Sequence, residues 1–399
     1  MMIELSDRIN AMEESATIAM SRKSRELIAE GKDVISLSLG EPDFNTPDFI
    51  KEAAQKAMDE NYTFYTPVPG YQDLREAIST KFKRDNNLDY SPDQIVVSTG
   101  AKQSIANVVL SVINKGDEVI IPAPYWVSYL EVVKVAEGTP VIVNAGIDND
   151  FKLSGKELEE AITPKTKLIM FSTPCNPTGS VYSKEELADL ARVLEKHPNI
   201  VVIADEIYEH INFRSKHESL AQFEAIKNQV VTVNGVSKAW AMTGWRLGYI
   251  GANKEIAAAC TKMQGQFTSA TCSITQKAAI AAMEADPAVL KDMIAAFESR
   301  RELVLNALNE IEGVKANVPE GAFYVFPDVS YFYGKSYNGR TIKNCNDLAM
   351  YLLDEALVAL VTGEAFGDPN CIRISYATSE EILTEAMRRI REALEKLSE

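Results

Sequence analysis

Apolar and polar residues follow two different periods along the middle of the chain, and the two periods alternate. Short apolar runs predict seven buried strands, at residues 95–98, 118–121, 140–144, 168–172, 200–204, 230–233 and 246–250. Segments between most of these runs, such as 102–114 and 184–196, repeat their apolar residues about every 3.6 positions and predict helices. The alternation predicts an α/β fold, with a mostly parallel sheet covered by helices on both faces. Ligands of such sheets bind at the carboxyl ends of the strands.

The residues outside this region predict a second, smaller unit. Before it, 15–30 has helical spacing, and 34–39 predicts a strand that enters a Gly-Glu-Pro-Asp-Phe turn. A long amphipathic helix is predicted from Pro287 to about Ile311. The remainder predicts strands at 323–327 and 371–376, helices at 346–357 and 380–397, and a polar surface loop at 331–343. We expect an N-terminal arm at 1–13, a small α+β domain from 14–46 and 287–399, and a large domain at 47–286.

Composition narrows the class of protein. With 399 residues, 46% of them hydrophobic, the chain can bury a core large enough for two domains. The net charge of −16 argues against a nucleic-acid or membrane-surface partner, because no basic field is present. No segment approaches the roughly 18 apolar residues of a membrane span, and the acidic start predicts no signal peptide. The five cysteines form no Cys-x-x-Cys pair, so we expect no metal site, no disulfide framework and a reducing, cytoplasmic location.

The candidate chemistry centres on residues 229–252, where polar groups are crowded between two predicted strands. Ser237 and Lys238 follow the first strand, and Arg246 precedes the second apolar run. One interpretation is a surface loop whose cations face water. The other is that Lys238 is a nucleophilic amine that forms a Schiff base with pyridoxal phosphate, while Ser237 and Arg246 hold the phosphate.

Other predicted strands carry polar groups at their ends, each with an ordinary alternative. Gly100 and Ala101 leave room for a phosphate at a helix N-terminus, although many such turns contain glycine. Asp205 is either a helix N-cap or the partner of a pyridine nitrogen. Trp126 is either a core residue or a ring that stacks on a cofactor. Arg373 either points outward or clamps a carboxylate.

The stretch 237–249, Ser-Lys-Ala-Trp-Ala-Met-Thr-Gly-Trp-Arg-Leu-Gly-Tyr, resembles the pyridoxal phosphate signature of class I aminotransferases of the aspartate aminotransferase type. The resemblance covers essentially the whole chain. Its other motifs are Ser-Ala-Thr (15–17), Gly-Glu-Pro-Asp-Phe (40–44), Pro-Tyr-Trp-Val-Ser-Tyr (124–129), Asn-Pro-Thr-Gly (176–179), Asp-Glu-Ile-Tyr-Glu-His (205–210), Gly-Ala-Phe-Tyr-Val (321–325) and Arg-Ile-Ser-Tyr-Ala-Thr-Ser (373–379). The chain is similar to the bacterial branch of these enzymes, some members of which also accept prephenate.

The resemblance implies the fold of pyridoxal phosphate-dependent transferases (fold type I) and a role for each matching residue. Lys238 matches the imine lysine and proton shuttle, and Asp205 the pyridine partner. The other matches are Tyr208 and Asn176 to donors for the ring oxygen, Trp126 to the stacking ring, Arg373 to the clamp on the substrate α-carboxylate, and Gly40 to a backbone contact with substrate. Relatives tend to have cis bonds at Ala123–Pro124 and Asn176–Pro177, so we expect at least one here. Tyr65 matches a tyrosine that reaches the phosphate of the neighbouring subunit, which implies a homodimer with shared active sites.

The implied reaction is transfer of the amino group of L-aspartate to 2-oxoglutarate, which gives oxaloacetate and L-glutamate. For the distal carboxylate this branch uses a lysine and two hydroxyls that match Lys102, Ser15 and Thr17. Prephenate-accepting relatives carry a further lysine shortly before Ser-Ala-Thr. Residues 12–14 are Met-Glu-Glu here, so we expect weak prephenate activity. The alternatives are an aminotransferase for prephenate, aromatic or alanine-type substrates, and a β-lyase of the same fold. The acidic charge disfavours a DNA-binding regulator.

Overall fold

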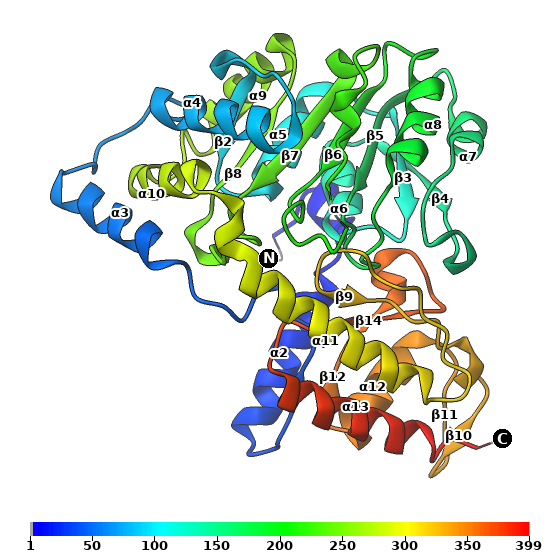
Figure 1. Ribbon diagram of the computed structural model, residues 1–399. Helices are drawn as coiled ribbons and strands as arrows, with labels where there is room; N and C mark the ends of the chain where they lie inside the picture. Colours follow the sequence, from blue (N-terminus) through cyan, green and yellow to red (C-terminus); the bar gives the residue numbers. More distant parts are fainter. Residues whose placement is uncertain (1–2, 215, 399) are drawn as a thin grey trace.

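A seven-stranded sheet forms the centre of the computed structural model, which describes residues 3–214 and 216–398 (Figure 1). Its strand order is β2-β8-β7-β6-β5-β3-β4. The strands are β2 (Ile95–Ser98), β3 (Glu118–Ala123), β4 (Thr139–Asn144), β5 (Thr166–Ser172), β6 (Val201–Asp205), β7 (Val230–Gly235) and β8 (Gly248–Gly251). β8 is antiparallel to both neighbours, and the other pairs are parallel. The expected mostly parallel sheet of seven strands is confirmed.

Different helices bury the two faces of this sheet, because successive strand residues point to opposite sides. In β6, Val202 and Ala204 belong to one hydrophobic cluster and Ile203 to another. The first cluster includes residues of α4 (Gln72–Lys81), α7 (Gly155–Ala161), α8 (Lys184–Leu194) and α10 (Ser273–Glu284). The second includes residues of α5 (Ala101–Val112), α6 (Ser128–Val135) and α9 (Lys254–Phe267). The sheet is therefore covered on both faces.

A second part of the molecule lies below this sheet in Figure 1 and is built from three small sheets. Its strands are β9 (Tyr324–Val325), β13 (Val361–Thr362) and β14 (Ile372–Ser375) in the antiparallel order β13-β14-β9, the parallel pair β1 (Ile35–Ser36) and β12 (Val358–Ala359), and the antiparallel pair β10 (Ser336–Tyr337) and β11 (Arg340–Thr341). Its helices are α2 (Ala16–Ala29), α11 (Lys291–Asn309), α12 (Cys345–Glu355) and α13 (Glu380–Leu394). The remaining helices are α1 (Asp7–Asn10) and α3 (Asp48–Asp59). Figure 1 shows α11 running from α10 into this part.

Several expected elements have different bounds. The strand expected at 246–250 begins at Gly248, because Arg246 has a left-handed φ of +59° and ends a 3-10 turn. The surface loop expected at 331–343 contains the hairpin β10–β11, whose turn residues Asn338 and Gly339 both have positive φ as a two-residue hairpin requires. Of the strand expected at 34–39, only the two residues of β1 form a strand. The helix expected from Pro287 begins with a 3-10 turn.

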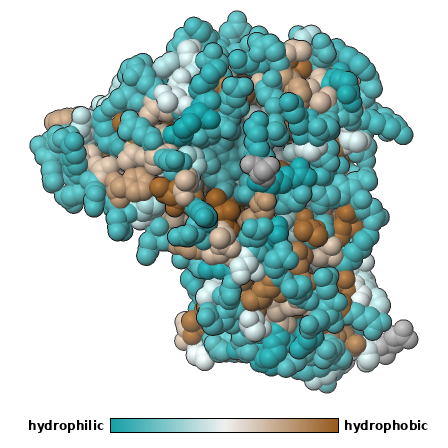
Figure 2. All heavy atoms as spheres, in the orientation of Figure 1, coloured by the Kyte–Doolittle hydropathy of each residue, from teal (hydrophilic) through white to brown (hydrophobic). Residues whose placement is uncertain are grey.

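The surface shown in Figure 2 is mostly hydrophilic, with scattered patches of apolar side chains. Three aromatic side chains of the described residues are strongly exposed: Phe64 and Tyr65 between α3 and α4, and Phe267 at the end of α9. Within residues 3–214 and 216–398, no helix is both long and apolar enough to cross a membrane.

Candidate active site

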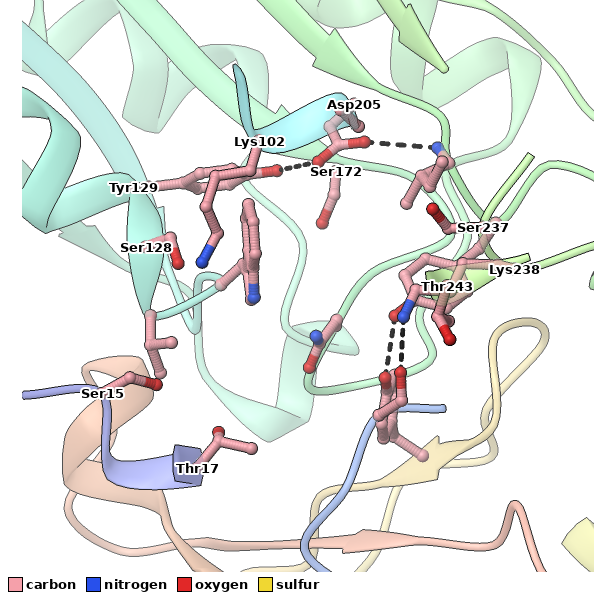
Figure 3. A pocket seen from close by; sticks show the side chains of 18 of the residues that line it. Ser15, Thr17, Lys102, Ser128, Tyr129, Ser172, Asp205, Ser237, Lys238 and Thr243 are labelled. Atoms are coloured by element: carbon pink, nitrogen blue, oxygen red, sulfur yellow. Dashed lines mark hydrogen bonds between the residues drawn. The ribbon is translucent and has the colours of Figure 1, made fainter. Parts of the chain in front are cut away.

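A cavity of about 300 Å³ opens at the carboxyl ends of β5, β6 and β7 (Figure 3). Residues of α2, β9 and β14 complete its wall, so both parts of the molecule contribute to it. Most residues singled out in the sequence line it: Ser15, Thr17, Gly40, Ala101, Lys102, Trp126, Asn176, Asp205, Tyr208, Ser237, Lys238, Arg246 and Arg373. Gly100 lies directly beside Arg246, and Tyr65 is not among the residues that line the cavity.

Lys238 lies in the loop after β7, and its amine is held by a backbone carbonyl. Its Nζ donates a hydrogen bond to the carbonyl oxygen of Gly40 at 2.5 Å. The rings of Tyr208 and Phe323 lie 5.6 and 5.9 Å from Nζ. Burial, followed by the positive charge of Arg373, lowers the pKa of Lys238 to about 8. A substantial fraction of this amine is therefore neutral and nucleophilic near physiological pH.

Asp205 ends β6 and is 4% exposed. Burial raises the pKa of its carboxyl to about 6, against the opposing effect of a hydrogen bond from Tyr129. The Tyr129 hydroxyl donates to Oδ2 at 2.8 Å, and the backbone N–H of Ile207 donates to Oδ1 at 3.3 Å. Ser172 faces Asp205 across the β5–β6 pair, and its buried hydroxyl has no hydrogen-bond partner among the described residues. This end of the cavity can pair a carboxylate with a cationic ring nitrogen.

Arg373 presents a buried cation with no carboxylate beside it in the described part of the chain. It lies on β14 and is 2% exposed. One guanidinium nitrogen donates to Asn176 Oδ1 at 2.9 Å and another to the Ser38 carbonyl oxygen at 2.5 Å. The face of Tyr324 lies 4.6 Å away. Burial lowers the pKa of Arg373, because the interior disfavours an uncompensated charge. Such a site favours an incoming anion with bidentate geometry, such as a carboxylate.

A second group of donors lies where α5 begins. Gly100 has a φ of +85°, and a Cβ at this position would lie 2.6 Å from a guanidinium nitrogen of Arg246. Gly248 is equally restricted, because a Cβ there would lie 2.2 Å from the Ala101 backbone nitrogen. The first backbone N–H groups of α5 have no partner within the helix. Together with Ser237 and the guanidinium of Arg246, they provide the donors and the positive charge that a phosphate requires.

Lys102, Ser15, Thr17 and Ser128 lie along another side of the cavity (Figure 3). The Lys102 Nζ lies 5.0 Å from the centre of the Trp126 ring. Partial desolvation in the cavity, followed by the nearby positive charge of Arg246, lowers the pKa of Lys102, although the residue is still exposed to solvent. No carboxylate pairs with Lys102 among the described residues. Besides Arg373 and the Arg246 that faces the phosphate-binding donors, the cavity thus holds Lys102 as a further cation that is available to an anionic ligand.

Comparison with known proteins identifies the family. Residues 32–390 match the model of "Aminotransferase class I and II". The chain is 50% identical to a probable aspartate/prephenate aminotransferase of Rickettsia bellii, covering 98% of each chain. It is 49% identical to a bifunctional aspartate aminotransferase and glutamate/aspartate-prephenate aminotransferase of Petunia hybrida, covering 98% of this chain and 83% of that one. The chain belongs to the class I and II aminotransferase family.

Solved structures of this family have the same fold. The aspartate aminotransferase of Rhizobium meliloti superimposes with a TM-score of 0.96 at 43% identity, covering 99% of this chain and 100% of that one. The Thermus thermophilus aspartate aminotransferase with maleate gives a TM-score of 0.92 at 39% identity, covering 98% and 100%. The expected fold of pyridoxal phosphate-dependent transferases is therefore confirmed.

Aminotransferases of classes I and II use pyridoxal 5′-phosphate, as the resemblance implied. The cavity fits this group on its own chemistry. It offers an amine for the carbonyl carbon, a buried carboxylate for the ring nitrogen, hydroxyl and amide groups for the ring oxygen, and an indole for the ring face. It also offers an unpartnered buried hydroxyl at Ser172 and a corner in which glycine leaves space for the phosphate.

Sequence reasoning assigned no site role to several cavity residues, among them the polar residues Tyr129, Ser128, Tyr324 and Ser172. Tyr129 and Ser128 lie in the Pro-Tyr-Trp-Val-Ser-Tyr motif, and Tyr324 lies in the Gly-Ala-Phe-Tyr-Val motif, so the motifs themselves were the available signal. Tyr324 shares a hydrogen bond of 2.8 Å with the hydroxyl of Tyr208. No sequence signal pointed to Ser172. Of the two peptide bonds expected to include a cis bond, Ala123–Pro124 is cis, which confirms that expectation; the other cis bond of the described residues is Thr173–Pro174.

Proposed function

We propose that the protein is an aspartate aminotransferase that transfers the amino group of L-aspartate to 2-oxoglutarate, giving oxaloacetate and L-glutamate. The observation that carries this proposal is the pair of cations in one cavity, Arg373 and Lys102, each without a carboxylate partner in the described chain. A dicarboxylic substrate supplies one carboxylate to each. The similar aspartate aminotransferase of Thermus thermophilus was solved with maleate, a four-carbon dicarboxylate, which supports the same choice.

The cofactor would be held by residues around the cavity. Lys238 would bind its carbonyl carbon, Asp205 its ring nitrogen, Tyr208 and Asn176 its ring oxygen, Trp126 its ring face, and Ser237, Arg246, Gly100 and Ala101 its phosphate. Bound pyridoxal phosphate supplies an electron sink that stabilises the carbanion left when the substrate Cα loses its proton.

The chain's own residues bind the substrate and move the proton. Arg373 would clamp the α-carboxylate, with the Asn176 side chain and the Ser38 carbonyl fixing the orientation of the guanidinium. Lys102, Ser15 and Thr17 would bind the distal carboxylate. The Lys238 Nζ, with a pKa of about 8, can accept the Cα proton and later return it. Gly40 contributes the carbonyl that holds this amine when it is free.

We also propose that two copies of the chain share their active sites. The side chain of Tyr65 is 98% exposed, and Phe64 beside it is 79% exposed. Neighbouring exposed aromatic residues are typical of a surface that contacts another protein. In a homodimer, Tyr65 would reach the phosphate held by the partner subunit.

Membership of the aminotransferase family supports amino acids and 2-oxo acids as the small-molecule substrates of the protein.

Two further expectations remain part of the proposal. The central sheet lies wholly within 95–251 and the small sheets outside it, which supports a large domain at 47–286 and a small domain from 14–46 and 287–399, with 1–13 as an arm. The five cysteines are unpaired, which supports a reducing compartment such as the cytoplasm.

Prephenate is the second candidate substrate, favoured by the names of several relatives. The electrostatics beside the substrate cavity argue for weak activity on it. A neighbouring cavity, which shares Lys102 and Ser15, is lined by Glu13, Glu14 and Glu131. These carboxylates disfavour a further anionic group on that side. We therefore expect a lower kcat/KM for transamination of prephenate by glutamate than for transamination of 2-oxoglutarate by aspartate.

The visible spectrum of the purified protein tests the function directly. We expect a yellow protein that is bleached toward the amine form when aspartate or glutamate is added alone, because half of the reaction needs no second substrate. Alanine at the same concentration serves as the control and should bleach it far more slowly. Rapid bleaching by phenylalanine or alanine with none by aspartate would contradict the proposed substrate class.

A further inference from the structure

Tyr129 and Asp205 form a buried pair in the wall of the cavity. Tyr129 lies in the first turn of α6, Asp205 ends β6, and 76 positions separate them in the chain. The phenol hydroxyl donates to Asp205 Oδ2 at 2.8 Å, the contact drawn as a dashed line in Figure 3. Tyr129 is 1% exposed and Asp205 4% exposed, so water competes little with this bond. A hydrogen bond to a charged group is stronger than one between neutral groups.

The ionised form of Asp205 depends on few donors. Within the described chain its carboxylate accepts hydrogen bonds from the Tyr129 hydroxyl and the Ile207 backbone N–H, and burial raises its pKa to about 6. Of the two donors, the Tyr129 bond is the shorter. Loss of the Tyr129 hydroxyl would raise the pKa of Asp205 further, because a hydrogen bond to the charged form would disappear. The other titratable groups that face the pair are Glu206, Lys238, Tyr208 and Cys175.

The ring of Tyr129 has a separate contact. It packs edge-on against Trp126, with ring centroids 5.6 Å apart and an interplanar angle of 88°. The hydroxyl of Tyr129 therefore orients the Asp205 carboxylate through a hydrogen bond. The ring of Tyr129 packs against the Trp126 indole that would cover the cofactor. Replacement of Tyr129 by Phe keeps the ring contact and removes only the hydroxyl, so the two contributions can be separated.

We propose that Tyr129 is a positioning residue whose phenol orients the Asp205 carboxylate and holds it ionised for the ring nitrogen of the cofactor. The proposal rests on the proposed function, because it assumes that Asp205 pairs with pyridoxal phosphate. Tyr129 acts through Asp205 and does not need to touch the substrate. Its hydroxyl should therefore matter most at the pH values where Asp205 would otherwise take up a proton.

The experiment measures the dissociation constant of pyridoxal phosphate between about pH 6 and about pH 9, by absorbance after equilibrium dialysis. It compares wild type with Tyr129→Phe and with Tyr90→Phe, a matched control whose hydroxyl is also buried but bonds to Thr232. We expect Tyr129→Phe to weaken binding about tenfold or more near pH 6 to 7, the scale of one hydrogen bond to a charged group. The factor should shrink toward pH 9, where Asp205 is ionised in both proteins. Unfolding midpoints check that each variant is folded.

Two outcomes would overturn the proposal. One is a Tyr129→Phe protein that binds the cofactor like Tyr90→Phe, and the other is a loss of affinity by the same factor at every pH. The same substitution in an Asp205→Asn background identifies the group involved, because the pH-dependent part of the loss should then disappear. If the pH-dependent part of the loss of affinity persisted in this background, titration of Glu206, Lys238, Tyr208 or Cys175 would be its cause, and the proposal would be contradicted. Failure of wild type to bind pyridoxal phosphate would instead refute the proposed function, so the two failures are distinguishable.

Discussion

The amine of Lys238 is hydrogen-bonded to the carbonyl oxygen of Gly40, a residue 198 positions earlier in the chain. Gly40 opens the Gly-Glu-Pro-Asp-Phe turn, and Lys238 follows the central strand β7. The turn is itself anchored, because Arg300 of α11 makes a bidentate ion pair with Asp43 at 2.7 and 2.9 Å. The position of the candidate nucleophile is therefore set by contacts between the two parts of the molecule.

Replacement of Lys238 by Ala should abolish transamination while the protein remains folded. The variant loses both the amine that holds the cofactor and the group that moves the Cα proton, and a general base alone contributes about 10²–10⁴-fold. We expect pyridoxal phosphate to be retained noncovalently through Asp205 and the phosphate-binding residues. Steady-state rates and the absorbance of the protein after gel filtration measure the two effects. A variant that transaminates at a rate near wild type would contradict the assignment of Lys238.

The pH dependence of stability should report the burial of Asp205. Burial raises its pKa from an ordinary value near 3.8 to about 6. The folded protein thus binds this proton more tightly than the unfolded chain does, so the contribution of Asp205 to stability is full below pH 3.8 and is lost as the pH rises through 6. The Asp205→Asn variant has no ionisable carboxyl at this position, so its stability does not decrease for this reason as the pH rises. In cofactor-free protein we expect the variant to gain about 2–3 kcal/mol relative to wild type between roughly pH 4 and pH 7.

Urea unfolding at a series of pH values measures this difference. Asp189 offers a control of opposite sign, because its hydrogen bond with Arg192 lowers the pKa of its carboxyl. Asp189 therefore contributes stability that is present at neutral pH and lost in acid. Asp189→Asn should lose stability relative to wild type as the pH rises. A flat difference for Asp205→Asn across this range would show that its carboxyl is not perturbed in solution.

The sheet was predictable from sequence because strands that are buried on both faces read as continuous apolar runs. The runs that became β5, β6 and β7 are of this kind, and the polar residues predicted at or after their ends, Asn176, Asp205 and Ser237, line one cavity. Arg246 was wrongly placed in a strand, because its left-handed backbone serves the turn before β8 rather than an apolar pattern.

Contacts between distant residues could not be predicted from periodicity. The pairing of Tyr129 with Asp205 depends on how α6 lies against the end of β6, and neither segment shows this in its sequence. The hydroxyl of Ser172 faces the cavity only because of the β5–β6 register. Such residues become candidates only when the fold brings them together, whereas Lys238 and Arg373 were marked by motifs that resemble a known family.

Mixed dimers can test whether Tyr65 serves the partner subunit. The Lys238→Ala homodimer should be inactive, and the Tyr65→Ala homodimer should be weakly active at limiting cofactor. After random subunit exchange, about half of the dimers are mixed. Each mixed dimer contains one complete site, with Lys238 from one chain and Tyr65 from the other, and one site that lacks both. Activity should therefore return to about a quarter of the wild-type value. Phe64→Ala, at the neighbouring exposed aromatic residue, serves as the control partner. If Tyr65 acted within its own subunit, no site would be complete and mixing would restore nothing.

Lys102 provides the sharpest test of substrate choice. A cation in the first turn of α5 opposes the helix dipole, so a nearby anion is the expected reason for its position. Lys102 is exposed in the open cavity, where an ion pair with a ligand would contribute at most about 1 kcal/mol. With substrate bound, Ser15, Thr17 and Trp126 would enclose the pair and remove water from it. Loss of one partner of such a buried pair costs on the order of 2–5 kcal/mol.

Lys102→Ala should therefore lower kcat/KM for aspartate by at least about thirtyfold, since each ~1.4 kcal/mol corresponds to a factor of ten. Activity on alanine and phenylalanine should change little, because neither has a distal carboxylate. Lys115→Ala, at an exposed lysine beyond the other end of α5, controls for the loss of one positive charge. An equal decrease for every substrate would show that Lys102 serves the phosphate or the fold. A decrease below about fivefold for aspartate would show a solvated pair. Either result would remove the second cation from the substrate site and with it the main support for a dicarboxylic substrate.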